Sequence, residues 1–134
     1  MQRLGKHKMK EIGVLILYLF GSEAEGATTI TSDIDIGVVL KEPRDLDDTR
    51  PLYSALYSEL ERVFKPTFVR ELDIVFLQKA PLTLQYNVIR NGRILYEEDA
   101  VRRANYEERV TNSYLDFEPV LEYFDEIASR RYAK

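Results

Sequence analysis

The sequence predicts an α+β domain in which helices flank a small mixed β-sheet. Apolar runs over residues 13–20, 33–40 and 71–77 have the length and composition of buried strands. Amphipathic stretches at helical spacing cover residues 49–64 and 81–90. Because strand and helix patterns alternate along the chain, the strands are expected to share one sheet with the helices packed on it.

The composition predicts one domain with a single core. The chain has 134 residues, of which 45% are hydrophobic, and it has no cysteine, so neither a disulfide framework nor a thiolate metal site is expected. The formal net charge is −4, which argues against broad binding to a nucleic-acid backbone. A cytoplasmic location is the expectation from this composition.

The N-terminal segment imitates a signal peptide. Four basic residues precede the apolar run from Ile12 to Phe20, and Ser22-Glu23-Ala24 follows it. Cleavage there would remove the Gly21-Ser22 element described below, and the run is too short to span a membrane. We therefore expect a short solvated basic segment before the first strand, and no membrane association.

The middle of the chain carries ordinary helix and loop signals. Ser22 can cap a short helix, and Gly26 to Ser32 reads as a polar loop. Asp47 or Asp48 can cap the helix over 49–64, which Lys65-Pro66 ends. The core stripe of this helix is predicted to be Leu52, Leu56, Leu60, Val63 and Phe64.

The last part of the chain is predicted to be helical after a short strand. The helix over 81–90 should stop at Asn91-Gly92, and residues 94–96 could add a strand. From 99 to 134 an apolar stripe repeats at spacings of four and three, and Pro119 should kink this helix or restart it near Asp116. The stripe is Val110, Tyr114, Phe117, Leu121, Phe124 and Ala128.

Two interpretations of this C-terminal stripe remain open. It could pack on the chain's own domain, or it could form a surface for a partner protein. The segment from Glu97 carries ten acids and six bases, which favours a basic partner.

The chemistry of the sequence is concentrated at the ends of the first two strands. Gly21-Ser22 ends one apolar strand, and after ten residues Asp33-Ile34-Asp35 opens the next. Alternate residues of a strand share a face, so the two aspartates should point the same way, with Ile34 in the opposite layer. Alone, a Gly-Ser pair is usually only a turn and an Asp-x-Asp a solvated strand end, but two like charges on one face favour a cation between them.

A third carboxylate is expected to join this pair. Glu71 and Asp73 share a face near the start of the strand over 71–77, where an acid is costly unless it is paired or bound to a metal. Three converging carboxylates can hold two divalent ions about 4 Å apart. The residues alone do not decide between Glu71 and Asp73.

These motifs resemble the polymerase-beta-type nucleotidyltransferase superfamily, and the small size resembles its minimal (MNT) branch. The resemblance covers residues 10 to 98 and includes Ala80-Pro81-Leu82 and the stretch from Arg90 to Glu97. It implies transfer of AMP from ATP to a hydroxyl, with two Mg²⁺ ions as cofactors. In MNT proteins of HEPN/MNT toxin–antitoxin pairs, it implies a tyrosine of the HEPN toxin as acceptor, and a hetero-oligomer.

The resemblance also assigns roles to individual residues. It implies that Asp33, Asp35 and Asp73 ligate the metal ions and act in catalysis. Gly21 and Ser22 would bind the nucleotide phosphates. The catalytic core is then residues 1–98, and residues 99–134 form a C-terminal helical segment of the same domain.

One feature departs from the family pattern. Many relatives have an arginine after Gly-Ser, whereas this chain has Glu23-Ala24-Glu25-Gly26. The triphosphate would then need a cation from elsewhere. The candidates are Lys41, Arg44, Lys79 and Arg90, among which the sequence does not choose.

Two other functions stay open at this point. The first is nucleotidyl transfer to a small hydroxylated molecule, which the small size disfavours. The second is a non-catalytic antitoxin that neutralises its partner by binding alone, which the intact acids disfavour.

Overall fold

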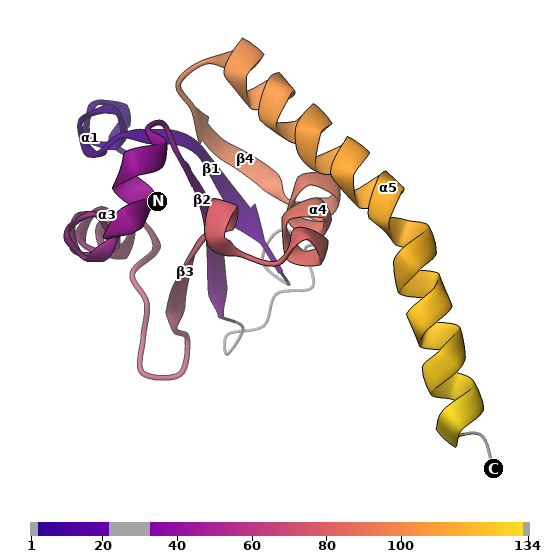
Figure 1. Ribbon diagram of the computed structural model, residues 1–134. Helices are drawn as coiled ribbons and strands as arrows, with labels where there is room; N and C mark the ends of the chain where they lie inside the picture. Colours follow the sequence, from indigo (N-terminus) through magenta and orange to yellow (C-terminus); the bar gives the residue numbers. More distant parts are fainter. Residues whose placement is uncertain (1–2, 22–32, 133–134) are drawn as a thin grey trace.

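The described residues, 3–21 and 33–132 of a computed structural model, build one mixed β-sheet with helices on both faces (Figure 1). The strands are β1 (Val14–Phe20), β2 (Ile34–Leu40), β3 (Leu72–Phe76) and β4 (Arg93–Glu97). Their order in the sheet is β3-β2-β1-β4. β1 is antiparallel to β2 and to β4, whereas β2 and β3 are parallel. The predicted fold class is therefore confirmed.

β1 is a central strand because both of its faces are apolar. Val14 to Leu19 are all buried, and the strand reads as a continuous hydrophobic run. Burying each such side chain contributes about 2 kcal/mol before the entropy cost of ordering it.

One face of the sheet is covered by α1 (Lys6–Ile12) and α3 (Arg50–Phe64). Alternation along β2 directs Ile34 and Ile36 to this side, and both are completely buried there. Leu56 and Leu60 of α3 pack against them, as the predicted core stripe requires. Leu52 and Phe64 lie at the edge of this cluster and are half-buried.

The basic N-terminal segment is a helix, which the sequence analysis did not foresee. Met9 is completely buried, while Lys6, Lys8 and Lys10 are exposed. The helix is fixed to α3 because the backbone N–H of Gly5 donates to Glu59 Oε2 (2.7 Å).

The ends of α3 follow the predicted signals closely. The Asp48 carboxylate accepts the backbone N–H of Arg50 (3.2 Å) and so satisfies one free donor of the first turn. Lys65 ends the helix in the left-handed conformation, directly before Pro66. The charged loop before α3 contains the short 3-10 helix η1 (Pro43–Asp47).

The opposite face is covered by α4 (Leu82–Asn91) and the first half of α5 (Ala100–Tyr132). The short 3-10 helix η2 (Leu77–Lys79) links β3 to this layer. Gly37 of β2 has no Cβ, which lets Leu77 pack directly on the strand. Gln78 then donates to and accepts from the backbone of Leu40, which ties η2 to the end of β2.

α5 is one continuous helix, so of the two alternatives expected at Pro119 a restart near Asp116 does not occur, whereas Figure 1 shows the helix changing direction about half-way along its length. Pro119 lies inside it. The first half is held by a hydrogen bond from the Tyr18 hydroxyl to Glu107 Oε2 (2.7 Å) and by stacking of Tyr114 on Tyr86 (3.9 Å between ring centroids). The second half continues away from the sheet (Figure 1). None of the helices in the described ranges is both long enough and apolar enough to cross a bilayer.

Candidate functional site

Asp35 and Asp73 lie side by side at one end of the sheet. In the parallel pairing of β2 with β3 these two residues are direct partners, and neighbouring strands are about 4.8 Å apart. In each strand, the residues on either side of the aspartate point to the face that α1 and α3 cover. Because successive side chains of a strand point to opposite faces, both carboxylates lie on the face that α4 and α5 cover. The strand pattern thus brings together two of the predicted acids.

Gly21 closes the site at the end of β1. Phe20 is the pairing partner of Asp35, and Gly21 follows with a φ of 74°, which favours glycine. A Cβ atom on Gly21 would overlap Asp35 Oδ2. The backbone of β1 can therefore reach the Asp35 carboxylate only because residue 21 is glycine. Ser22, the predicted partner of Gly21, lies outside the described residues.

Asp33 stands one residue before β2 and is tied to the start of β3. The backbone N–H of Glu71 donates to Asp33 Oδ1 (3.2 Å), and the backbone N–H of Ile34 donates to the Glu71 carbonyl (2.8 Å). Asp33 is exposed, as is Glu71. This role of the Glu71 backbone was not visible in the sequence, because it depends on the parallel pairing of the two strands.

The three aspartates interact electrostatically. Partial burial raises the pKa of Asp35, and the negative charges of Asp73 and then of Asp33 raise it further. A carboxylate in this position is more stable when a cation or a proton compensates its charge.

The donor set suits a hard divalent cation. Carboxylate oxygens are the ligands that Mg²⁺ takes from proteins, together with water and phosphate oxygens. In the described ranges, no three acidic or histidine side chains already stand close enough to form a metal cluster. The fit therefore rests on the chemistry of the acids and on their mutual repulsion.

Arg90 is placed better than the other three candidate cations. The end of α4 lies against the end of β1, because a Cβ on Gly92 would come within 3.2 Å of the Leu19 carbonyl oxygen. Arg90 therefore sits at the acidic end of the sheet and on the same face, with its guanidinium over the Tyr86 ring (5.9 Å). The other three cations lie toward the opposite end of the sheet. Lys41 pairs with Glu98, Lys79 donates to the Leu46 carbonyl, and Arg44 lies in η1.

Sequence reasoning also left out Arg93 as a candidate cation. The pairing of β4 with β1 places Arg93 opposite Leu19, near the acidic end. Its position two residues after the helix stop at Asn91 could have suggested this, but only if β4 was known to pair with β1.

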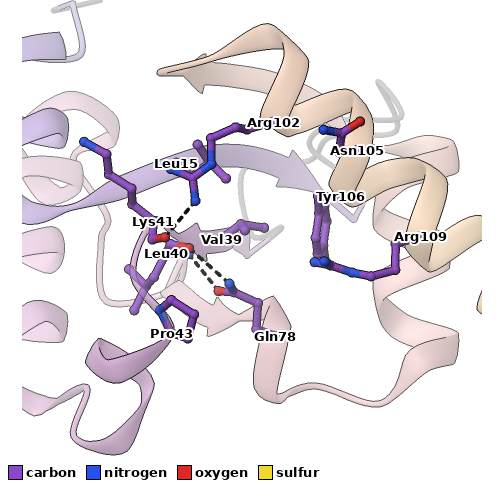
Figure 2. A pocket seen from close by; sticks show the side chains of 10 residues that line it. All are labelled: Leu15, Val39, Leu40, Lys41, Pro43, Gln78, Arg102, Asn105, Tyr106 and Arg109. Atoms are coloured by element: carbon purple, nitrogen blue, oxygen red, sulfur yellow. Dashed lines mark hydrogen bonds between the residues drawn. The ribbon is translucent and has the colours of Figure 1, made fainter.

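A pocket at the other end of the sheet is separate from the acids. It has a volume of about 300 Å³ and is lined by residues from the ends of β1 and β2, from η2 and from α5 (Figure 2). Lys41, Gln78 and Arg102 are among them. From Asp35 to Leu40 the strand advances about 17 Å, at 3.3–3.4 Å per residue, so this pocket is not part of the acidic site.

Comparison with solved structures finds the same fold in chains of toxin–antitoxin complexes. One, from a toxin–antitoxin pair solved with AMP-PNP, has 22% identity and a TM-score of 0.65, and the match covers 93% of this chain and 99% of that one. A second, from an MntA toxin–antitoxin pair in which two aspartates two positions apart are changed to glutamate, has 17% identity, the same TM-score of 0.65 and coverages of 93% and 99%.

A third solved chain comes from a complex of a tri-AMPylated Shewanella oneidensis HEPN toxin with an MNT antitoxin. It has 19% identity and a TM-score of 0.62, and the match covers 96% of this chain and 99% of that one. Among curated proteins, no sequence matches this chain.

The family assignment follows from the sequence itself. Residues 3–101, well over half of the chain, match the model of the family described as polymerase beta, nucleotidyltransferase. These residues include all four strands and the three aspartates of the site. The chain therefore belongs to the polymerase-beta nucleotidyltransferase family.

Proposed function

We propose that this chain transfers AMP from ATP to a tyrosine hydroxyl of a HEPN-family toxin and so acts as its antitoxin. The observation that carries the proposal is the acidic end of the sheet, where Asp35 and Asp73 are neighbours and Gly21 gives the backbone access to Asp35. Membership of the nucleotidyltransferase family supports the transfer reaction. The similarity to chains from toxin–antitoxin complexes, one with a tri-AMPylated HEPN toxin, supports the choice of acceptor.

Asp33, Asp35 and Asp73 would hold two Mg²⁺ ions between them. When bound, the ions would offset the charge of the triphosphate and make the attacking hydroxyl easier to deprotonate. The raised pKa of Asp35 supports this role, because its carboxylate lacks a compensating charge among the described residues. The variant of a similar chain in which two aspartates two positions apart were altered supports the pairing of Asp33 with Asp35.

The transfer balances without any further reactant. The oxygen of the acceptor hydroxyl forms a bond to the α-phosphorus of ATP. The bond from that phosphorus to the oxygen that bridges the α- and β-phosphorus atoms breaks. Pyrophosphate leaves with the electron pair, and the hydroxyl proton passes to Asp73. Asp73 is exposed, so an acceptor on another protein can reach it. Most of the acceleration comes from positioning and charge compensation.

The phosphates of ATP would lie at the end of β1. Gly21 exposes its backbone there, and Ser22 would add a hydroxyl donor. Arg90 would supply the cation that the acidic stretch Glu23-Ala24-Glu25 does not.

The test of the proposed chemistry is Asp35→Asn. Without the charged ligand, nucleotidyl transfer should fall on the order of a hundredfold or more. Folding should survive, since the substitution removes a charge that burial and two neighbouring carboxylates disfavour. Transfer is measured with ATP labelled at the α-phosphate, and urea unfolding gives the stability. Asp33→Asn should behave in the same way, and near-normal transfer by the purified variants would rule out the metal assignment.

The acceptor is identified in the same assay by adding a purified HEPN-family toxin, taken from a neighbouring reading frame where one is encoded there. Label on a tyrosine of that protein, located by mass spectrometry, is the expected result. Label that appears only on small hydroxylated molecules would contradict the proposed acceptor. Neutralisation of the toxin by the Asp35→Asn variant, without any label, would instead indicate an antitoxin that acts by binding alone.

A further inference from the structure

The two halves of α5 have different surroundings. In the first half, Tyr106 and Val110 are buried under the sheet, and Tyr114 stacks on Tyr86. After Tyr114, no residue up to Arg130 is buried. Figure 1 shows the second half extending beyond the sheet and the other helices.

Large apolar side chains nevertheless continue along this second half. Phe117, Val120, Phe124 and Ile127 follow one another at spacings of three and four, and 41%, 42%, 62% and 39% of their surfaces are exposed. Tyr123 is 60% exposed and touches Phe124 edge to face (5.8 Å between centroids). We call these residues, with Leu121 and Ala128, the distal face.

The distal face is too wide for a simple two-helix seam. At about 100° per residue, its seven members span an arc of roughly 160° around the helix, more than a narrow coiled-coil stripe. Of the acids in this segment, Glu118, Glu122, Asp125 and Glu126 fall on the other side, whereas Asp116 falls within the arc near one edge. A helix of this kind fits into a groove, where a partner contacts its apolar face from more than one direction.

The second half of α5 also lacks the contacts that would stabilise it as a lone helix. Isolated helices of about 15 residues are marginal in water, and a proline inside a helix costs about 3 kcal/mol more than alanine. Pro119 adds this cost in a segment in which no described residue is buried. Burial of the distal face by another protein would offset it.

We infer that the distal face docks into an apolar groove of the protein that accepts AMP, the HEPN toxin of the proposed function. The inference rests on that proposal and adds the place of contact. The solved relatives include most of α5, since a coverage of 93% omits only 7% of this chain, about nine residues, whereas α5 has 33 residues.

A second copy of this chain is the less suitable occupant. Between Leu115 and Ile127 the sequence has five acids and no lysine or arginine. Pairing with another α5 would bring two such segments together and would leave the edges of the wide distal face uncovered. A partner with positive charge around its groove would instead be attracted before contact.

The test compares two double variants of the full chain. Phe117→Ser with Phe124→Ser removes the centre of the distal face. Val101→Ser with Leu115→Ser makes the same kind of change at exposed apolar residues of the same helix, 68% and 51% exposed, that lie off this face. Binding to the purified HEPN-family toxin of the transfer assay is measured by calorimetry, and circular dichroism checks the folding of each variant.

The distal-face variant should bind on the order of thirtyfold more weakly, as loss of a central aromatic anchor does, and the control should bind like the unmodified chain. Equal binding by all three proteins, or equal loss in both variants, would overturn the inference. So would a dimer of the chain alone that sedimentation detects and the distal-face variant abolishes. If that variant does not fold, Phe124→Ala, which keeps helix propensity, replaces it with the same expected direction.

Binding and transfer fail independently in this design. Asp35→Asn should lose transfer but keep full binding through the distal face. A chain that binds the HEPN protein through this face without modifying it would contradict the proposed function and leave the inference standing. If the variant without Phe117 and Phe124 still modifies the HEPN protein and binds it with undiminished affinity, the inference is contradicted and the proposed function stands.

Discussion

At the scale of single residues, the candidate site depends on the absence of a side chain at Gly21. Two glycines among the described residues have a positive φ. Gly13 directly precedes β1, and Gly21 directly follows it. Only at Gly21 would a Cβ meet a predicted metal ligand. Comparing substitutions at the two positions therefore distinguishes the effect of backbone strain from the effect of displacing the Asp35 carboxylate.

Gly21→Ala should abolish most nucleotidyl transfer, because its methyl group would push the Asp35 carboxylate aside. Gly13→Ala is the matched control, since its φ is 97° and its Cβ would meet only Asp45 Oδ2 at an ordinary 3.5 Å. Both variants should lose roughly 1–2 kcal/mol of unfolding free energy for the left-handed conformation. Urea unfolding and the labelled-ATP assay measure the two effects. Equal transfer by the two variants would show that Gly21 does not act through Asp35.

Glu71 and Asp73 can be separated in the same assay. Asp73→Asn should lose transfer, because Asp73 is the strand partner of Asp35. Glu71→Gln should keep most of it, because Glu71 holds Asp33 through its backbone N–H, which the substitution leaves in place. The opposite ranking would move the third acid of the site to Glu71.

At the scale of elements, local sequence signals predicted the strands and most helix ends. β1, β2 and β3 are largely apolar runs, and each lies within two residues of its predicted range. α3 ends at Lys65-Pro66 as expected, since proline cannot continue a helix easily. Strand alternation was enough to assign Asp35 and Ile34 to opposite faces.

The helix that was missed, α1, depends on contacts distant in the sequence. α1 is helical because Met9 and Gly5 pack on α3, more than 40 residues away. The predicted end of α4 at Asn91-Gly92 is confirmed, but its cause differs from the expected one, because Gly92 has no left-handed φ and a Cβ there would overlap the Val88 carbonyl oxygen. Pro119 lies within a continuous α5, although local rules favour an interruption there. None of these outcomes follows from the local pattern alone.

For the candidate site, the sequence predicted the identity of the residues better than their arrangement in space. The spacing of Asp33 and Asp35 indicated a shared face. The register that places Asp73 opposite Asp35, and the position of Arg90 at the same end, required the order of the strands. Whether Ser22 contributes stays a prediction.

At the scale of the whole molecule, two buried tyrosines connect α5 with the rest of the fold. Tyr18 of β1 donates to Glu107, which also accepts from Arg103, and Tyr106 of α5 donates to Gln85 of α4 (2.8 Å). Burial raises the pKa of Tyr18, and the hydrogen bond to Glu107 and the charge of Glu107 raise it further. Burial likewise raises the pKa of Tyr106. Both hydroxyls therefore stay protonated in the folded protein well into alkaline solution.

This difference predicts how stability depends on alkaline pH. In the unfolded chain both tyrosines titrate near 10.0, whereas the folded protein keeps their protons. Their contribution to the free energy of unfolding is thus complete below pH 10 and falls above it by about 1.4 kcal/mol per pH unit for each tyrosine. Urea unfolding between about pH 9 and pH 12 measures this slope.

Tyr18→Phe with Tyr106→Phe should flatten the slope, whereas Tyr53→Phe with Tyr123→Phe, at residues 39% and 60% exposed, should leave it unchanged. An unaltered slope in the first variant would mean that the buried hydroxyls ionise in the folded state, and that the attachment of α5 to the sheet does not depend on their protons.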